Sequence, residues 1–417
     1  MGNCIGLGEY NSNSKYLIYY IIFNFLYEGI IGLEYGSLYH PIIIYYKQKV
    51  IMYHKLAVDS FCYFGVFLLS FIIIYYESDN KERNSIFNKR NTYIKLIHDN
   101  ETSFNKNKYN TFIVALTWVI HVLFIKVYYQ SNFGYLDYWA FEMIITYFIS
   151  KNMFKIEIYS HQKFSIYFIT IFCSLSIFCS FILTLLKEKD IIYKKYPICI
   201  PIGIIIYLII LSIRSYSNCK IKWLTDLKYI STGKFLSIYG IIGTFCCTLI
   251  CTLTTFFDCG KNKLELCFVE KNGKTYYDSF SSFFDEYFKD SFKIIDIIIF
   301  IVLIISKFFV SLYYVLTIKY LTPVYAICLP SIHYFILQII LLFNTIIQGK
   351  TEIIKSQLAK VILEISTDFF SILGIFVYIE LIEIRICGLN YNLRRTIRLR
   401  GIKDLKIQYK LEESFED

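Results

Sequence analysis

Long apolar stretches separated by short polar segments constrain this chain more than any other feature of its sequence. A helix needs about 20 apolar residues to cross the hydrocarbon core of a bilayer, where it satisfies its own backbone groups. Hydrophobic residues make up 56% of the 417 residues and charged residues 18%, whereas soluble domains carry about 25% charge. We therefore predict an all-α, polytopic membrane protein. Its ten transmembrane helices are expected near 17–45, 56–76, 111–130, 132–150, 164–186, 197–213, 235–257, 294–318, 320–345 and 361–384.

Lysine and arginine residues predict which side of the membrane each loop faces, because cytosolic loops carry an excess of them. The excess falls on a single side when both termini are cytosolic. The cytosolic segments are then the N-tail 1–16, the loops 77–110, 151–163, 214–234 and 319, and the basic C-tail 385–417. The long loop 258–293 faces a lumen or the exterior.

The ten spans divide into two halves of five, at 17–186 and 187–384. An odd number of spans per half gives the two halves opposite orientations in the membrane. This is the arrangement of inverted-repeat transporters, in which the substrate site lies near the midplane of the bilayer. The sequence therefore predicts two inverted five-helix halves.

Charge, cysteine content and motifs argue against several classes of function. The net charge of +10 is dispersed over the loops, which argues against nucleic-acid binding. The 13 cysteines form no CxxC pair, so we expect no metal, redox centre or cofactor. No Walker loop, nucleophile elbow or HExxH pair occurs, and we therefore expect a protein that is not an enzyme.

Three parts of the chain resemble a known family. The stretch KWLTDLKYISTGKFLSIYGIIGTFCCTLICTLTTF (222–256) is similar to the segment that enters the seventh helix of drug/metabolite transporters of protists. FEMIITYFISKNMFKIEIYSHQKFSIYFI (141–169) resembles their fourth and fifth helices. KYLTPVYAICLPSIHYF (319–335) and DFFSILGIFVYIELIEIRICGLNYNLRR (368–395) resemble their ninth and tenth helices.

The resemblance implies membership of the drug/metabolite transporter superfamily, with its solute-carrier-35-like, EamA-like and chloroquine-resistance-transporter-like carriers. Such membership implies a ten-helix secondary carrier that moves a small organic solute by alternating access. An anionic solute is expected, such as a nucleotide-sugar, a sugar phosphate or a similar metabolite, in the Golgi, the ER or another endomembrane. The expected partners are this solute and the lipid bilayer, with a homodimer left open. A multi-span receptor and a membrane-embedded lipid-modifying enzyme are the alternatives.

Ionisable residues inside the spans are candidate site residues, because such residues are costly in a bilayer and usually face a cavity or a partner. In the first span Glu28 shares a helix face with Asn24, Gly32 and Gly36, and it serves either a pore or the packing of a neighbouring helix. In the third span His121 follows Thr117 on one face, as a ligand, a proton carrier or a packing residue. In the fourth span a cavity-facing set is expected from Tyr138, Glu142 and Thr146.

Lys307 is the strongest of these candidates, since it lies too far from either end of the eighth span for easy snorkelling. Ser311 and Tyr314 share its face. A buried ammonium needs an anion, which is either the substrate or a carboxylate such as Glu142 or Asp368 of the tenth span. We therefore predict that Lys307, Tyr314 and Asp368 belong to the substrate site.

Two of the five prolines occur in the ninth span. Pro323 is expected in the first turn, where a missing N–H costs little. Pro330 lies further in and is predicted to kink the helix as a gating element, with Ser331 and His333 beside the cavity. A kink that serves packing alone is the alternative.

Covalent modification is expected at two places. Cys259 and Cys267 in the loop 258–293 are predicted to form a disulfide if that loop lies in an oxidising compartment, and two free thiols are the alternative. Gly2 and Cys4 are only partly typical of an acylation site, so their modification is left open.

Overall fold

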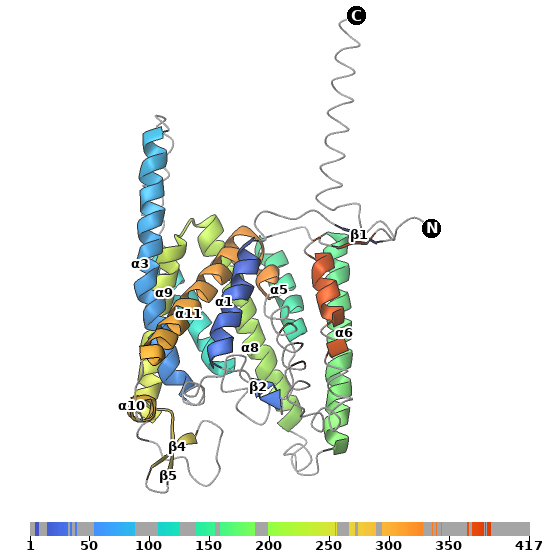
Figure 1. Ribbon diagram of the computed structural model, residues 1–417. Coiled ribbons are helices and arrows are strands. Elements are labelled where there is room, and N and C mark those ends of the chain that lie inside the picture. The colour runs from blue at the N-terminus through green and yellow to red at the C-terminus, as the bar shows by residue number, and fades with distance from the viewer. Residues whose placement is uncertain are drawn as a thin grey trace, which may run out of the picture.

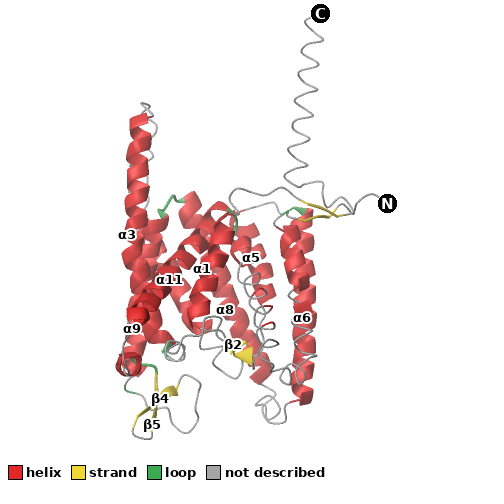
Figure 2. Ribbon diagram, in the orientation of Figure 1, coloured by secondary structure: helices red, strands yellow, loops and turns green. Residues whose placement is uncertain are grey.

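A computed structural model describes much of the chain and is almost entirely helical (Figures 1 and 2). The described residues are 5–7, 15–31, 34–35, 38–39, 54–87, 107–125, 139–154, 159–187, 199–254, 256, 267–271, 274–288, 294–327, 336, 339, 343, 365–366, 369–378, 380 and 382–384. The helices are α1 (Lys15–Ile31), α3 (Lys55–Phe87), an unlabelled helix at Asn107–Ile125, α5 (Trp139–Phe154), α6 (Ser160–Lys187), α8 (Cys199–Lys222), the π-helical turn η2 (Trp223–Leu227), α9 (Thr232–Thr254), α10 (Phe280–Phe288), α11 (Ile294–Tyr320) and a short helix at Phe369–Tyr378.

The strands within this part of the chain form three short antiparallel pairs. They are β1 (Ile5–Leu7) with β6 (Ile382–Ile384), β2 (Glu34–Tyr35) with β3 (Leu38–Tyr39), and β4 (Cys267–Lys271) with β5 (Lys274–Tyr277). Figure 1 places β1 and β6 at one end of the helical bundle and α10, β4 and β5 at the other. The expected loop 258–293 therefore contains a hairpin and a helix.

Several helices are long and apolar enough to cross a membrane, which confirms that the chain is an integral, multi-pass membrane protein. Within the described residues there are five, at Lys55–Glu77, Asn107–Ile125, Ile202–Asp226, Thr232–Thr254 and Ile294–Tyr320. They correspond to the second, third, sixth, seventh and eighth spans expected from the sequence. The large apolar side chains that remain exposed on them, such as Phe245 and Ile301, have the chemistry of a lipid-facing surface.

The expected first span, 17–45, is too long. Helix α1 ends at Ile31, and the strands β2 and β3 follow it. The face that begins with Asn24 and Glu28 therefore does not continue as a helix through Glu34 and Tyr35. Hydropathy averaged over a long window does not separate an apolar helix from a short hairpin that follows it, which explains the error.

The expected sixth span, 197–213, is too short. Helix α8 continues through Arg214 to Lys222, and the apolar segment extends to Asp226. Arg214 therefore lies inside a span and not in a cytosolic loop 214–234. The predicted span ended before Arg214 because the residue that compensates its charge is distant in the sequence.

Helices α3 and α9 pack closely because two glycines of α9 face α3. A Cβ atom on Gly240 would lie 2.5 Å from the backbone nitrogen of Phe67, and one on Gly243 would lie 2.3 Å from the ring of Tyr63. Side chains at these two positions would force the helices apart. Elsewhere in the bundle α1 packs on α11 through aromatic pairs such as Phe23 with Phe309, whose ring centroids are 4.4 Å apart.

We expect Gly240→Ala to lower the free energy of unfolding by about 2 kcal/mol, because an added methyl group in a packed contact costs about 1–3 kcal/mol. Chemical unfolding of the purified protein in detergent measures this. Thr252→Ala is the control, since Thr252 is exposed on the same helix and should change stability by less than about 0.5 kcal/mol. Equal stability of Gly240→Ala and wild type would show that the two backbones are not in close contact.

At each end of the α3–α9 pair, a carboxylate accepts hydrogen bonds from the first backbone N–H groups of a helix. Glu77 of α3 accepts hydrogen bonds from the backbone N–H groups of Thr232 and Gly233, at 3.3 and 3.4 Å, where α9 begins. At the opposite end Asp278 accepts hydrogen bonds from the N–H groups of Leu56 and Ala57, at 2.7 and 3.2 Å, where α3 begins. Each carboxylate satisfies orphan donors and complements the helix dipole.

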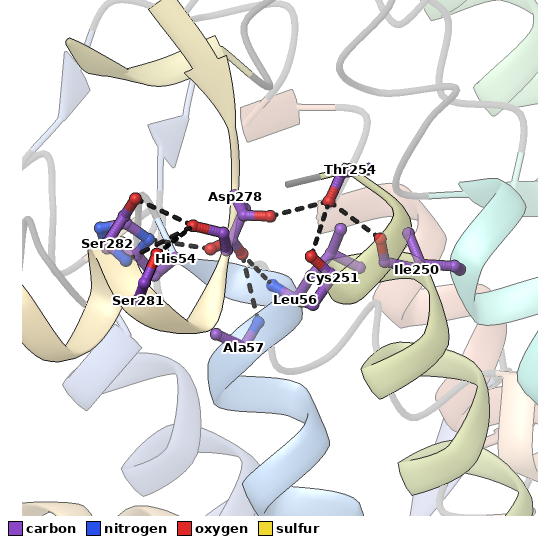
Figure 3. Close-up of polar contacts among 10 residues, drawn as sticks. His54, Leu56, Ala57, Ile250, Cys251, Thr254, Asp278, Ser281 and Ser282 are labelled. Atoms are coloured by element: carbon purple, nitrogen blue, oxygen red, sulfur yellow. Dashed lines mark hydrogen bonds and ion pairs between the residues drawn. The ribbon is translucent and has the colours of Figure 1, made fainter. Parts of the chain in front are cut away.

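The contacts of Asp278 also include the side chain of His54 and the end of α9 (Figure 3). His54 Nδ1 lies 2.8 Å from Asp278 Oδ1, and both side chains are buried. The hydroxyl of Thr254 donates to the backbone carbonyl of Asp278 at 2.9 Å. Asp278 thus links the segment before α10 to both α3 and α9.

The ninth span begins as expected. Helical backbone starts at Pro323, and the side-chain oxygen of Thr322 accepts a 3.4 Å hydrogen bond from the N–H group of Tyr325, as a helix cap does. Pro330, Ser331 and His333 lie outside the described residues, so the predicted kink stays a prediction.

Candidate functional site

A buried ion pair between α5 and α8 is the centre of the candidate site. Arg214 Nε lies 3.1 Å from Glu142 Oε1, and the two side chains are 19% and 1% exposed. Arginine stays charged inside proteins, so Glu142 provides the compensating charge that lets α8 cross the bilayer with Arg214 inside it. The sequence predicted Glu142 as a cavity residue and missed its partner.

Polar and aromatic side chains surround the guanidinium of Arg214. Its side chain contacts the hydroxyl of Tyr314 on α11, and this hydroxyl donates to Asn218 Oδ1 at 3.2 Å. The ring of Tyr314 lies 5.8 Å from that of Tyr20 on α1 and 5.6 Å from that of Trp118. Five helices therefore meet at this point, namely α1, the helix Asn107–Ile125, α5, α8 and α11.

Several buried polar atoms near the ion pair have no hydrogen-bond partner among the described residues. They are Thr146 Oγ1 on α5, and Ser215 Oγ and Asn218 Nδ2 on α8. Unsatisfied buried polar groups are rare in native proteins, because each one costs about 1–3 kcal/mol. These groups beside one ion pair can bind a polar ligand or water.

Thr146 faces α8 at the same seam. Helices α5 and α8 run parallel, since Glu142 pairs with Arg214 and Ser150 lies 3.2 Å from Cys219. Thr146 follows Glu142 by four residues and precedes Ser150 by four, so it shares their face. Its buried hydroxyl therefore lies between the ion pair and the Ser150–Cys219 contact.

His121 is buried next to this seam, with 4% of its surface exposed. Neither ring nitrogen hydrogen-bonds a side chain in the part of the chain that the structure describes. Arg214 is the charged group that acts on it, and Trp118 lies one turn earlier on the same helix. The structure thus places His121 near Arg214, and its role in a substrate site stays a prediction.

Lys307 of α11 lies in a separate aromatic environment. Its Nζ is 4.8 Å from the centroid of the Tyr27 ring and 5.8 Å from that of Tyr63. Tyr27 donates a 3.2 Å hydrogen bond to Asp59 Oδ1. Glu142, one of the alternative partners considered for Lys307, pairs with Arg214.

The remaining predicted site residues are placed as follows. Glu28 is partly buried on α1, and its charge acts on Lys307 and on Tyr20. The backbone of Cys267 begins β4. The residues outside the described part of the chain are Tyr138, Pro330, Ser331, His333, Asp368 and Cys259, so the predictions for them, including the disulfide, stay predictions.

Two functional candidates were missed by sequence reasoning, namely Arg214 and Asn218. The signal was available in the stretch LSIRSYSNCK, where arginine and asparagine are four residues apart in a helix that begins with a long apolar run. Such spacing places both side chains on one face. What concealed it was the assumption that the span ended at residue 213.

The described residues contain no group of three or more His, Cys, Asp or Glu side chains placed to hold a metal ion. Comparison of the sequence with known protein families and with curated proteins finds no match to either.

Proposed function

We propose that this protein is a secondary carrier that moves a small organic anion across a membrane by alternating access. The observation that carries the proposal is the buried Arg214–Glu142 pair with unsatisfied polar groups around it. A purely structural ion pair would be expected to have its neighbours satisfied, because partly satisfied buried networks are costly. A ligand that visits the site explains why donors and acceptors are kept there.

The chemistry of the site favours an anionic solute. Arg214 presents a planar fork of donors that matches a carboxylate or a phosphate. An arriving anion replaces Glu142 as the partner of Arg214 and accepts hydrogen bonds from Asn218 Nδ2 and the free hydroxyls. The guanidinium of Arg214 is thereby never left without an anionic partner inside the membrane. After release the Glu142 pair forms again and allows the empty carrier to reorient.

The packing of the described helices supports ten spans in two related halves. Numbered as the expected spans, α1 is the first and α11 the eighth, and these two pack together. The third, Asn107–Ile125, contacts the sixth, α8, through a 3.0 Å hydrogen bond from Ser217 to Thr117. Adding five to each span number, with the count continuing from the tenth span to the first, converts the pair of spans one and eight into spans six and three. This is expected if the two halves are repeats of each other.

Two further contacts fit the same relation. Helices α3 and α9, the second and seventh spans, pack against each other. Helix α6 and the segment Phe369–Tyr378, the fifth and tenth, contact through Phe172 and Phe370, whose ring centroids are 4.6 Å apart. Adding five to each span number exchanges the two members of each pair, so each contact is its own counterpart. We therefore propose two inverted five-helix halves.

Topology, location and family complete the proposal. Strand β1, near the N-terminus, pairs with β6, which occupies the last three residues of the tenth expected span, 361–384, so that span ends earlier than expected and these two segments lie on one side of the bundle (Figure 1). With the lysine and arginine distribution this supports two cytosolic termini. The sequence resemblance supports a place in the drug/metabolite transporter superfamily and an endomembrane such as the Golgi or ER.

Thr146→Val tests the site, because valine keeps the shape of threonine and removes the unsatisfied hydroxyl. We expect stability to rise by about 1 kcal/mol, since an unsatisfied buried group is lost. Transport should fall about tenfold, since the solute loses one charge-assisted hydrogen bond. The measurements are unfolding in detergent and exchange of radiolabelled glutamate, phosphoenolpyruvate, glucose 6-phosphate or UDP-glucose in proteoliposomes.

Thr317→Val is the matched control. Thr317 is equally buried on α11, but its hydroxyl donates to the carbonyl of Tyr313 at 2.7 Å. This variant should keep transport and gain no stability. Exchange of none of the four probes, or full transport by a stabilised Thr146→Val variant, would remove the support for the proposed site.

A further inference from the structure

Lys307 has an environment that differs from that of Arg214. It lies near the middle of α11, thirteen residues from each end of this 27-residue helix. Its contacts within the described chain are the faces of Tyr27 and Tyr63, and no carboxylate of that part lies within ion-pair distance. Arg214, by contrast, has Glu142 at 3.1 Å.

The two cations also differ chemically. Arginine remains charged in any protein environment, whereas a lysine amine exists in both the charged and the neutral form. Two ring faces recover part of the hydration that an ammonium loses inside a membrane, but they supply no compensating charge. Lys307 is therefore a group that the fold allows to gain and lose a proton.

The other ionisable groups around Lys307 come from three helices. Helix α1 contributes Tyr27 and Glu28, and α3 contributes Cys62 and Tyr63. Helix α9 contributes Cys247 next to Lys307, and Tyr239 donates to Tyr63 at 3.3 Å. Asp59 is linked to this set through Tyr27. Glu28 and Asp59 are the carboxylates of this set, and the nearer groups are tyrosines and thiols.

Lys307 and Arg214 lie on the same internal seam between α1 and α11. Tyr27 and Tyr20 of α1 are seven residues apart, as are Lys307 and Tyr314 of α11, so each pair occupies one helix face about 10 Å apart. Tyr27 contacts Lys307, and Tyr20 contacts Tyr314 beside Arg214. A change in the charge of Lys307 therefore changes the electrostatic potential close to the anion site.

We propose that Lys307 carries a proton that is transported together with the anion. This inference rests on the proposed carrier function. From the side of higher proton concentration the amine takes up H⁺ and becomes an ammonium, which attracts the anion to the seam. After reorientation the anion leaves and the ammonium gives its proton to water on the opposite side. The carrier then returns with a neutral amine, and the cycle moves one proton with each solute molecule.

Lys307→Arg tests this, because arginine keeps the positive charge but cannot release a proton. The experiment uses the full-length protein in proteoliposomes and the four radiolabelled probes named above, first in exchange at equal pH and then with the outside more acidic by about one pH unit. Wild type should exchange a probe and accumulate it up to about tenfold when driven by the gradient. Lys307→Arg should keep exchange and lose the accumulation, and an internal pH dye should show no acidification.

Lys319→Arg is the matched control, since Lys319 lies in the last turn of the same helix and should behave as wild type. Size-exclusion chromatography shows whether each variant is folded, and Lys307→Gln replaces Lys307→Arg if the latter aggregates, with loss of accumulation expected again. Accumulation by either folded variant at the wild-type level would overturn the proton role and leave the carrier function intact. Exchange of no probe by wild type would contradict the carrier function itself, and the proton role would fall with it.

Discussion

Replacing Glu142 by glutamine is expected to destabilise the protein by about 3–5 kcal/mol. The substitution leaves the guanidinium of Arg214 inside the membrane without the carboxylate that lies 3.1 Å away in the wild type. Breaking a buried pair by removing one partner costs this much because the remaining charge is uncompensated. Chemical unfolding of the purified protein in detergent measures the loss.

The double variant Glu142→Gln with Arg214→Gln should recover most of this stability, because both charges are removed together. It should nevertheless exchange none of the anionic probes, since the charged group that binds them is gone. Recovered folding without recovered transport separates a role in the site from a role in stability. A double variant that transports normally would exclude Arg214 from the anion site.

A partly exposed ion pair between the end of α8 and η2 provides the control. Lys222 Nζ lies 3.0 Å from Asp226 Oδ2, and the Asp226 side chain is 48% exposed. Asp226→Asn should cost less than about 1 kcal/mol, because exposed pairs contribute little. If Glu142→Gln cost no more than Asp226→Asn, the Arg214 environment would be hydrated and not buried.

Replacing Asp278 by alanine is expected to cost about 2–4 kcal/mol. The carboxylate accepts hydrogen bonds from two backbone N–H groups at the start of α3 and lies 2.8 Å from His54. Loss of a helix cap costs about 0.5–2 kcal/mol, and hydrogen bonds to a charged group are worth about 1.5–3 kcal/mol each. Unfolding in detergent gives the total change in stability.

Hydrogen exchange followed by mass spectrometry locates the effect. In Asp278→Ala the amides of Leu56 and Ala57 should exchange faster, while the part of α3 around Glu77, which binds the start of α9, should stay protected. Asp285→Ala is the control, because Asp285 is exposed on α10. Unchanged exchange at Leu56 in Asp278→Ala would show that Asp278 does not hold the start of α3.

Part of the candidate site followed from the sequence, and the physical reason is local. A carboxylate, a histidine or a lysine in the middle of an apolar stretch is costly in a bilayer wherever its partner lies, so Glu142, His121 and Lys307 were identifiable from their own neighbours. The helical period also placed Thr146 on the face of Glu142 and Tyr314 on the face of Lys307. The start of a helix at Pro323 depended on the missing N–H of proline alone.

Other features depended on partners that are remote in the chain. Arg214 ended a span in the prediction because a single sequence does not show that Glu142, on another helix, compensates its charge. Asp278 and His54 are 224 positions apart, and no local pattern indicates that one holds the other at the start of α3. The sequence by itself therefore determined the membrane setting and the unusual polar residues, since burial in lipid penalises each residue separately. The tertiary structure decided which of these residues are in contact, because two side chains on different helices interact only when those helices pack together.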